Sequence, residues 1–190
     1  GGSMVETMRR FRAGMPWSSV LHSWAILDSH DTARFRTIAG SRERQLVGVG
    51  LQMTSPGVPM IFAGGEIGLE GEWAEDARRT IPWDAADTWD TELLDTYRRL
   101  VELRRSSRAL SRGGIRYAHV EEDAVAYVRE SPVETILCLA ARDRHEPVRV
   151  PLAAVGGSGL ETLWGEDAQV AGGEAVLPAR APAFHAWRVT

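Results

Sequence analysis

Hydrophobic residues in the first hundred positions follow two patterns, a helical repeat in three segments and an unbroken run in two short ones. The helical segments are 5–13, 41–54 and 91–105, and the unbroken runs are 24–27 and 58–62. Apolar residues spaced three or four apart predict amphipathic helices, whereas short apolar runs bounded by Gly, Pro or polar residues predict buried strands. The resulting order of helix, strand, helix, strand and helix is typical of a parallel α/β fold.

The predicted helix over 41–54 has a clear start signal and an unusual interior. Ser41 is a favoured N-cap residue, and Asp90 has the same role before the third predicted helix. Gly48 and Gly50 lower the helix propensity of this segment. We therefore expect the helix to pack closely against its neighbours at these two glycines.

The pattern changes after the segment 106–113, where short hydrophobic runs separated by turn residues begin and continue to the end of the chain. The runs are 115–120, 124–129, 135–141, 148–152, 160–164, 175–177 and 183–189. Short strands at this spacing predict an antiparallel β-sandwich. We therefore divide the chain into residues 5–108 and 109–190, and we expect the second part to close a core from its own strands.

Length and charge narrow the class of protein. A complete eight-stranded β/α barrel needs about 250 residues, and this chain has 190. Its hydrophobic content of 44% and charged content of 25% are those of an ordinary globular protein. The net charge of −4 argues against a nucleic-acid or anionic-membrane surface. No apolar run approaches the roughly 20 residues of a membrane span.

Two features bear on the origin of the chain and its compartment. Residues 1–4, Gly-Gly-Ser-Met, are typical of a remnant left by an expression vector. Cys138 is the one cysteine, so the chain forms no internal disulfide, and its place in a hydrophobic run predicts a buried thiol. A lone buried cysteine fits a reducing compartment, and we expect a cytoplasmic location.

The most informative stretch lies where the first hydrophobic run ends and polar residues begin. The sequence Leu-Asp-Ser-His-Asp-Thr-Ala-Arg over 27–34 places His30, Asp31 and Arg34 directly after a predicted buried strand. The carboxyl ends of parallel strands are where β/α barrels hold their active sites. This stretch closely resembles the signature on the seventh barrel strand of the α-amylase family of glycoside hydrolases. Residues 56–68 resemble the eighth strand of the same family.

A third motif, Arg-Arg-x-x-Pro-Trp-Asp over 78–84, matches the loop that follows the eighth strand in that family. The three motifs occur in the family's order and at its spacing. The resemblance therefore implies the last portion of a TIM (β/α)8 barrel, around strands seven and eight, followed by a C-terminal antiparallel β-sandwich domain.

The resemblance also implies roles for individual residues. Asp31 matches the aspartate that stabilises the transition state, a catalytic role. His30 matches a histidine that hydrogen-bonds the same sugar, and Arg34 matches an arginine that pairs with a site carboxylate or the substrate. The family's nucleophile and acid/base carboxylates have no counterpart in this sequence. We expect Asp28 to be a buried, hydrogen-bonded acid and Glu66 to brace its loop.

Trp73 is the candidate for stacking on a sugar, because it lies in a Gly-rich loop at the expected mouth of the barrel and presents a flat apolar ring. Packing within the loop is the other interpretation of this residue. The histidines lack the ligand spacing of a zinc site, and the acidic residues of 70–76 match no calcium-binding loop. We therefore expect no metal and no cofactor.

The resemblance is to the maltodextrin glucosidase, neopullulanase and cyclomaltodextrinase branch of the family. It implies part of a retaining α-glucan hydrolase acting on α-1,4-glucosidic bonds of starch-derived oligosaccharides, with α-1,6 bonds left open. Because two of three carboxylates are missing, we expect the chain alone to be inactive. A non-catalytic α-glucan-binding module and a structural or interaction module are the alternatives. The implied partners are the α-glucan, the N-terminal part of the same barrel and a second copy of the chain.

Overall fold

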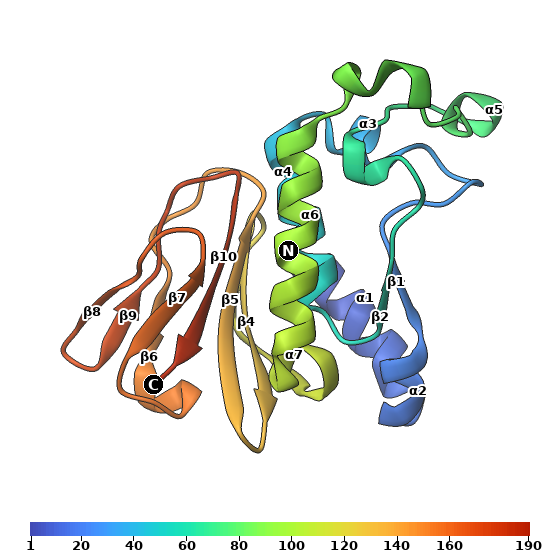
Figure 1. Cartoon of the computed structure of the whole chain (residues 1–190). Coiled ribbons are helices and arrows are strands. Elements are labelled where there is room, and N and C mark those ends of the chain that lie inside the picture. The colour runs from blue at the N-terminus through green and yellow to red at the C-terminus, as the bar shows by residue number, and fades with distance from the viewer.

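The computed structural model describes the backbone of residues 1–190 and every side chain except that of Ala74. Helices and two short strands make up the first part, and strands dominate from residue 114 onward (Figure 1). The helices are α1 (Gly2–Ala13), α2 (Trp17–His22), α3 (Phe35–Ala39), α4 (Arg42–Thr54), α5 (Ala74–Ala77), α6 (Thr91–Ser106) and α7 (Arg108–Arg112). The 3-10 helices are η1 (Gly65–Ile67), η2 (Trp83–Thr88) and η3 (Leu152–Val155). The strands are β1 (Trp24–Ile26), β2 (Val58–Met60), β3 (Gly114–Val120), β4 (Ala124–Ser131), β5 (Glu134–Ala141), β6 (Arg149–Pro151), β7 (Leu160–Trp164), β8 (Gln169–Ala171), β9 (Glu174–Val176) and β10 (Ala183–Val189).

The two strands of the first part pair in parallel, as the α/β order predicts. Trp24 lies opposite Val58, and Ile26 lies opposite Met60. The three helices predicted from periodicity are confirmed as α1, α4 and α6. One face of this small sheet is exposed to solvent, since Trp24 keeps 72% of its surface exposed and Ile26, two residues further along the strand, is also exposed. Large apolar side chains on an open strand are typical of a sheet that continues into further strands.

Helix α4 begins and packs as the sequence predicts. The hydroxyl of Ser41 accepts a hydrogen bond from the Arg44 amide at 3.1 Å, which is the expected N-cap. A Cβ atom added at Gly50 would overlap the ring of Phe184, and one at Gly48 would overlap Phe35. The two glycines therefore allow the helix backbone to approach these rings, which confirms the expected close packing.

The second part is the predicted β-sandwich. A five-stranded antiparallel sheet in the order β3-β4-β5-β10-β7 faces a three-stranded sheet in the order β6-β9-β8. Buried side chains of both sheets fill the space between them, including Val128, Leu139, Val150, Leu177 and Trp187. The run at 169–171, which forms β8, is exposed along its length and gave no hydrophobic signal in the sequence.

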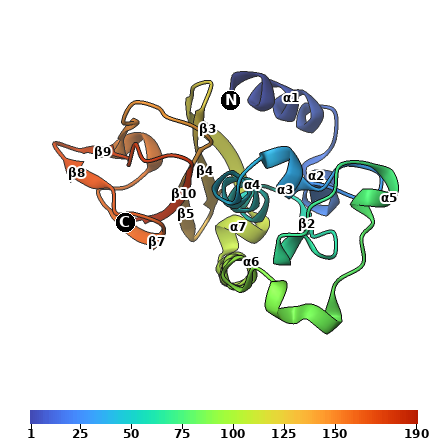
Figure 2. The same ribbon diagram turned by 90° about the horizontal axis from the view of Figure 1, so that it is seen from above.

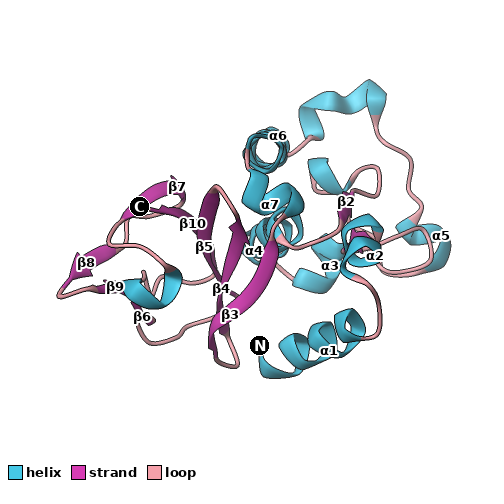
Figure 3. Ribbon diagram, turned by 90° about the horizontal axis from the view of Figure 1, so that it is seen from below, coloured by secondary structure: helices cyan, strands magenta, loops and turns pink.

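The core between the two sheets consists of residues 124–187 alone, which confirms that the second part closes a core from its own strands, and a second core lies on the other face of the five-stranded sheet. Strand β4 is buried on both faces, because alternate residues point to opposite sides of the sheet. Val128 faces the three-stranded sheet, whereas Tyr127 joins a second cluster with Met53 of α4 and Leu100 of α6. Figures 2 and 3 show α4 and α7 lying directly against the five-stranded sheet. The two parts of the chain share one of their two cores.

Two arginines fasten the end of α4 and the turn that follows it. Arg104 of α6 donates to the carbonyls of Met53 at 2.7 Å and Ser55 at 2.9 Å. Arg129 of β4 is fully buried and donates to the carbonyl of Thr54 and, at 2.9 Å, to that of Gly113. Cations at the C-terminus of a helix satisfy its last carbonyls and complement its dipole.

The remaining expectations for the chain as a whole are met in different degrees. Cys138 is fully buried in β5, and burial raises the pKa of its thiol to about 12, so a structural thiol is confirmed. Residues 2–4 form the first turn of α1, and the predicted division at 108/109 falls inside α7. That division stays a prediction. Among the described residues, the helices are too short or too polar to span a lipid bilayer.

His185 of β10 is buried in its neutral form. Its ring stacks on Trp187 with the ring centroids 5.5 Å apart, and its Nδ1 accepts a hydrogen bond from the Glu166 amide at 3.0 Å. Burial is the main reason that the pKa of His185 is lowered from its ordinary value, although the Glu166 carboxylate acts in the opposite direction. A proton on Nδ1 would also remove its ability to accept this hydrogen bond.

We expect the free energy of unfolding to fall on acidification because of His185. The unfolded chain protonates this histidine near its ordinary pKa of about 6.5, while the folded chain resists until a lower pH. Between these values the unfolded state binds more protons, so stability is present above about pH 6.5 and lost below it. Urea unfolding at pH 7.5 and 5.5 should show a smaller loss in His185→Gln than in the wild type. Equal losses in the two proteins would contradict this assignment.

Candidate functional site

The loop that joins β1 to α3 carries the predicted catalytic residue. Asp31 lies beyond the carboxyl end of β1 and keeps 69% of its side chain exposed. Its carboxylate lies 3.2 Å from Nε2 of His30 and 3.4 Å from Nη2 of Arg78. Arg78 also donates to the carbonyl of His30 at 2.9 Å. The structure therefore brings an aspartate, a histidine and an arginine together at an accessible position.

Asp28 fixes the base of this loop. Its side chain is buried, and its Oδ2 accepts a hydrogen bond from the Phe35 amide at 2.8 Å, at the start of α3. Burial raises the pKa of Asp28, while this hydrogen bond and the charge of Arg34 act in the opposite direction. The expectation of a buried, hydrogen-bonded acid is confirmed. Asp28 fixes the loop from below, and His30, Asp31 and Thr32 are the exposed residues between Asp28 and Phe35.

Arg34 lies inside the protein, with 1% of its surface exposed. Its guanidinium donates to the carbonyls of Ala77 and Ala63, each at 2.7 Å, and lies 4.0 Å from the centre of the Phe62 ring. Burial lowers its pKa. This placement makes Arg34 a brace between distant parts of the chain. The prediction that it contacts substrate receives no support from the placement and stays untested.

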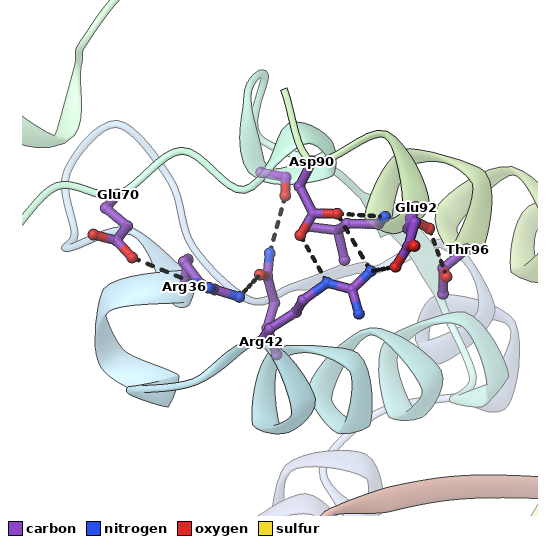
Figure 4. A network of polar contacts seen from close by, with 9 residues as sticks. Arg36, Arg42, Glu70, Asp90, Glu92 and Thr96 are labelled. Carbon is purple, nitrogen blue, oxygen red and sulfur yellow. Dashed lines mark hydrogen bonds and ion pairs between the residues drawn. The ribbon is translucent and has the colours of Figure 1, made fainter. Parts of the chain in front are cut away.

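The long segment from Ile61 to Asp90 is tied to α3 and α4 at several points. Figure 4 shows one network, in which Arg42 of α4 donates to Asp90 at 2.8 Å and to Glu92 at 3.0 Å. In the same view Arg36 of α3 lies 3.5 Å from the carboxylate of Glu70. The carboxylates of Arg42's partners are thus held beside the N-terminus of α6, where negative charge is favourable.

Further hydrogen bonds hold the segment, one of them within it and two to α3 and the residue before it. Glu66 accepts a hydrogen bond from the Gly64 amide at 2.8 Å, which fits the bracing role expected for this acid. The Gly71 amide donates to the Thr37 hydroxyl at 2.9 Å, and its carbonyl accepts from the Arg34 amide at 2.8 Å. The loop that lies over the carboxyl ends of β1 and β2 is therefore held in one position.

We expect Arg34→Met to release this loop. The substitution keeps much of the apolar stem but removes both hydrogen bonds from the guanidinium, so the carbonyls of Ala63 and Ala77 lose their partner. Hydrogen bonds to charged groups contribute about 1.5–3 kcal/mol each, and a loss of about 3–6 kcal/mol is expected for the pair. Hydrogen exchange should accelerate in residues 63–77. Arg36→Met is the comparison variant, because Arg36 is less buried and reaches Glu70 and Gln45 only at 3.5 Å, so its effect on the same residues should be much smaller. Unchanged protection of 63–77 in Arg34→Met would refute the bracing role.

Two tryptophans of the loop are open to solvent. Trp73, the predicted stacking residue, precedes α5 and is 68% exposed. Trp83, at the start of η2, is 70% exposed. The exposure of Trp73 does not fit packing within the loop, but a contact with sugar stays a prediction. Trp83 is not among the site residues predicted from the sequence, although the Arg-Arg-x-x-Pro-Trp-Asp motif contains it.

Among the described residues, neither a metal-binding cluster nor the large cavity of the molecule is found at Asp31. No group of three or more His, Cys, Asp or Glu side chains there is placed to hold a metal ion. A cavity of about 510 Å³ lies between the start of α1, α3, α4, the turn that joins β3 to β4 and the end of β5, lined by Phe35, Leu51 and Val125 among others. His30 and Asp31 do not line it. The Asp31 loop is therefore an open surface, not a closed pocket.

Fold and site together define a class of protein. A parallel strand pair with helices carries an aspartate, a histidine and an arginine beyond its carboxyl end, and an antiparallel β-sandwich follows. This is the architecture of the closing strands of a glycoside hydrolase barrel with its C-terminal domain.

Sequence comparison agrees with this class. The chain is 31% identical to neopullulanase 2 of Thermoactinomyces vulgaris over 91% of its own length and 30% of that protein. It is 33% identical to a cyclomaltodextrinase of a Bacillus species over 70% of its own length and 24% of that protein. No protein-family profile matches the chain. The chain thus spans about a quarter to a third of the curated relatives it matches.

Structural comparison gives the same result. A debranching enzyme of Nostoc punctiforme superimposes with a TM-score of 0.84 and 25% identity, over the whole of this chain and 40% of that one. A cyclomaltodextrinase superimposes with a TM-score of 0.81 and 29% identity, over 94% of this chain and 31% of that one. Over nearly its whole length the chain is therefore similar to the C-terminal portion of α-amylase-family glycoside hydrolases.

Proposed function

We propose that this chain is the C-terminal part of a retaining α-glucan hydrolase and that Asp31 is its transition-state-stabilising carboxylate. The observation that supports this most directly is the placement of Asp31, accessible beyond the carboxyl end of β1 and flanked by His30 and Arg78. The substrate class is a starch-derived oligosaccharide with α-1,4-glucosidic bonds, and α-1,6 bonds are a second candidate linkage. Relatives named neopullulanase and cyclomaltodextrinase support that class.

The chemistry of retention assigns these residues their tasks. Cleavage with retention needs one carboxylate as nucleophile and a second carboxyl as acid and then base, with an oxocarbenium-like transition state. In the proposed mechanism both groups come from the upstream part of the barrel. Asp31 supplies negative charge and hydrogen-bond acceptors to the sugar as positive charge develops on it. His30 donates to a hydroxyl of the same sugar, and Arg78 holds the loop that carries both.

The exposed face of β1 and β2 supports a partner in the form of the preceding barrel strands. Trp24, Ile26 and Val58 are large apolar residues left exposed on this two-stranded sheet. A two-stranded parallel sheet is marginally stable alone, because parallel sheets normally have further strands at their edges and other elements packed on both faces. Pairing with the upstream strands of the same enzyme would bury these side chains. A structural role in holding that barrel closed is the second candidate function, and this apolar face favours it.

The chain by itself should release no reducing sugar from maltodextrin, pullulan or cyclodextrin. The reason is that Asp31 cannot form the covalent intermediate and protonate the leaving group at once, and the groups that contact it are an imidazole and a guanidinium. The measurement is a reducing-sugar assay over a range of chain concentrations, with heat-denatured chain as the control. Release that rises in proportion to the native chain would refute this part of the proposal.

A further inference from the structure

Trp83 is an exposed aromatic residue with a fixed orientation. Its ring packs against Trp89 in an edge-to-face arrangement, with centroids 5.5 Å apart and planes at 68°. Trp89 is itself held, because its Nε1 donates to the carbonyl of Pro82 at 3.2 Å. Trp83 nonetheless remains 70% exposed. A folded chain normally buries most of a tryptophan, so a ring that is braced yet left in solvent suggests a binding surface.

The surroundings of Trp83 keep this ring in place. The Trp83 amide donates to the carbonyl of Ile81 at 2.9 Å, and the Thr88 hydroxyl donates to the carbonyl of Ala85 at 2.7 Å. The end of the segment is fixed by Asp90, whose amide donates to the Ile67 carbonyl at 3.2 Å. A preorganised surface of this kind binds a ligand with a smaller loss of conformational entropy than a mobile one.

The segment lies at the same end of the molecule as the Asp31 loop. Arg78, five residues before Trp83, is the arginine that contacts Asp31 and the His30 carbonyl. In Figure 1 the segment from α5 to the start of α6 lies beyond the carboxyl ends of β1 and β2. An oligosaccharide bound at Asp31 would therefore lie close to the segment that carries Trp83.

We propose that Trp83 is a stacking surface for a glucosyl unit of an α-glucan, separate from the unit at Asp31. The proposal rests on the function proposed above and adds to it a second point of contact with the glucan chain. The C–H face of glucose is flat and apolar and matches an indole ring. The neighbouring Asp84 and Asp87 are exposed, and their carboxylates are available to sugar hydroxyls around that ring. Trp83 takes no part in bond cleavage.

The test is an NMR titration of the whole chain with maltoheptaose, in which each indole Nε1–H and the amides of His30 and Asp31 are followed separately. Trp83→Ala should weaken binding by about tenfold, the loss expected for one aromatic contact. Trp17→Ala is the matched control, since Trp17 is an exposed tryptophan of α2 that lies outside the Asp31 loop and the 61–90 segment, and its affinity should stay within about twofold of the wild type. Trp83→Phe keeps a ring and should retain most of the affinity, which separates stacking from a general effect on folding.

The outcomes distinguish this proposal from the one on which it rests. Unchanged affinity in Trp83→Ala, or no movement of the Trp83 indole signal at saturating maltoheptaose, overturns the stacking surface. If the Asp31 amide still shifts in that case, the proposed function stands. If the Trp83 indole shifts and Trp83→Ala weakens binding while the Asp31 and His30 amides do not move, the stacking surface is supported and the role of Asp31 is contradicted.

Discussion

Replacement of Asp31 by Asn should lower kcat by about 10²–10³-fold in a polypeptide that joins this chain to the missing barrel strands. Asn has the shape of Asp but carries no charge, so it loses the attraction to the positive charge that develops on the sugar. Because that charge is present in the transition state and not in the bound substrate, kcat should fall far more than KM changes. The measurement is steady-state hydrolysis of a maltodextrin by the two proteins.

The structure supplies a matched control for this prediction. Asp76 is an exposed carboxylate of α5 that pairs with Arg79, as Asp31 pairs with Arg78. Unlike Asp31, it also accepts a hydrogen bond from the Glu72 amide. Asp76→Asn should leave kcat within about twofold of the wild type, as is usual for a surface substitution. Asp31 is exposed, so Asp31→Asn should also leave the unfolding curve of the chain nearly unchanged. An Asp31→Asn enzyme that keeps most of its kcat/KM would show that Asp31 is not the stabilising carboxylate.

Replacement of Arg129 by Met should reduce the free energy of unfolding by about 3–5 kcal/mol, because each buried carbonyl left without a partner costs about 1–3 kcal/mol. Arg129 donates to the carbonyls of Thr54, Gly113 and Gly114, the last at 3.0 Å. Burial lowers the pKa of Arg129 to about 10, so the guanidinium stays charged at neutral pH. Met fills part of the same volume but donates no hydrogen bond, and urea unfolding measures the difference.

The same experiment tests whether the two parts of the chain unfold together. Arg129 connects β4 with the end of α4, and the shared core connects α4 and α6 with the five-stranded sheet. We therefore expect one unfolding transition in the wild type. Arg98→Met is the control, since Arg98 lies exposed on α6 with Asp95 as its partner, and it should have a much smaller effect. Two separate transitions in the wild type, or equal effects of the two substitutions, would contradict the clamp.

Local features of the sequence predicted the elements and the chemistry well. The short hydrophobic runs of β4 and β5 predicted strands, and Ser41 and Asp90 predicted the helix starts, because both signals act over a few residues. Gly50 predicted close packing, since a residue without a side chain in a helix interior normally has a steric reason. The placement of Asp31 directly after a predicted strand indicated a site at the strand's carboxyl end, but β1 itself is exposed at Trp24 and Ile26 and not buried as predicted.

Only the tertiary structure decided where the buried arginines point and which surfaces share a core. The sequence predicts Arg34 at the site because it matches an arginine of the family motif, yet it is buried and its acceptors at Ala63 and Ala77 come from 29 and 43 residues away. Arg129 depends in the same way on Thr54, 75 residues distant in the chain. The hydrophobic run of β4 predicted a strand, but not that α4 and α6 cover one of its two buried faces. Periodicity records which side of an element is apolar, and the partner that covers that side is set by long-range packing.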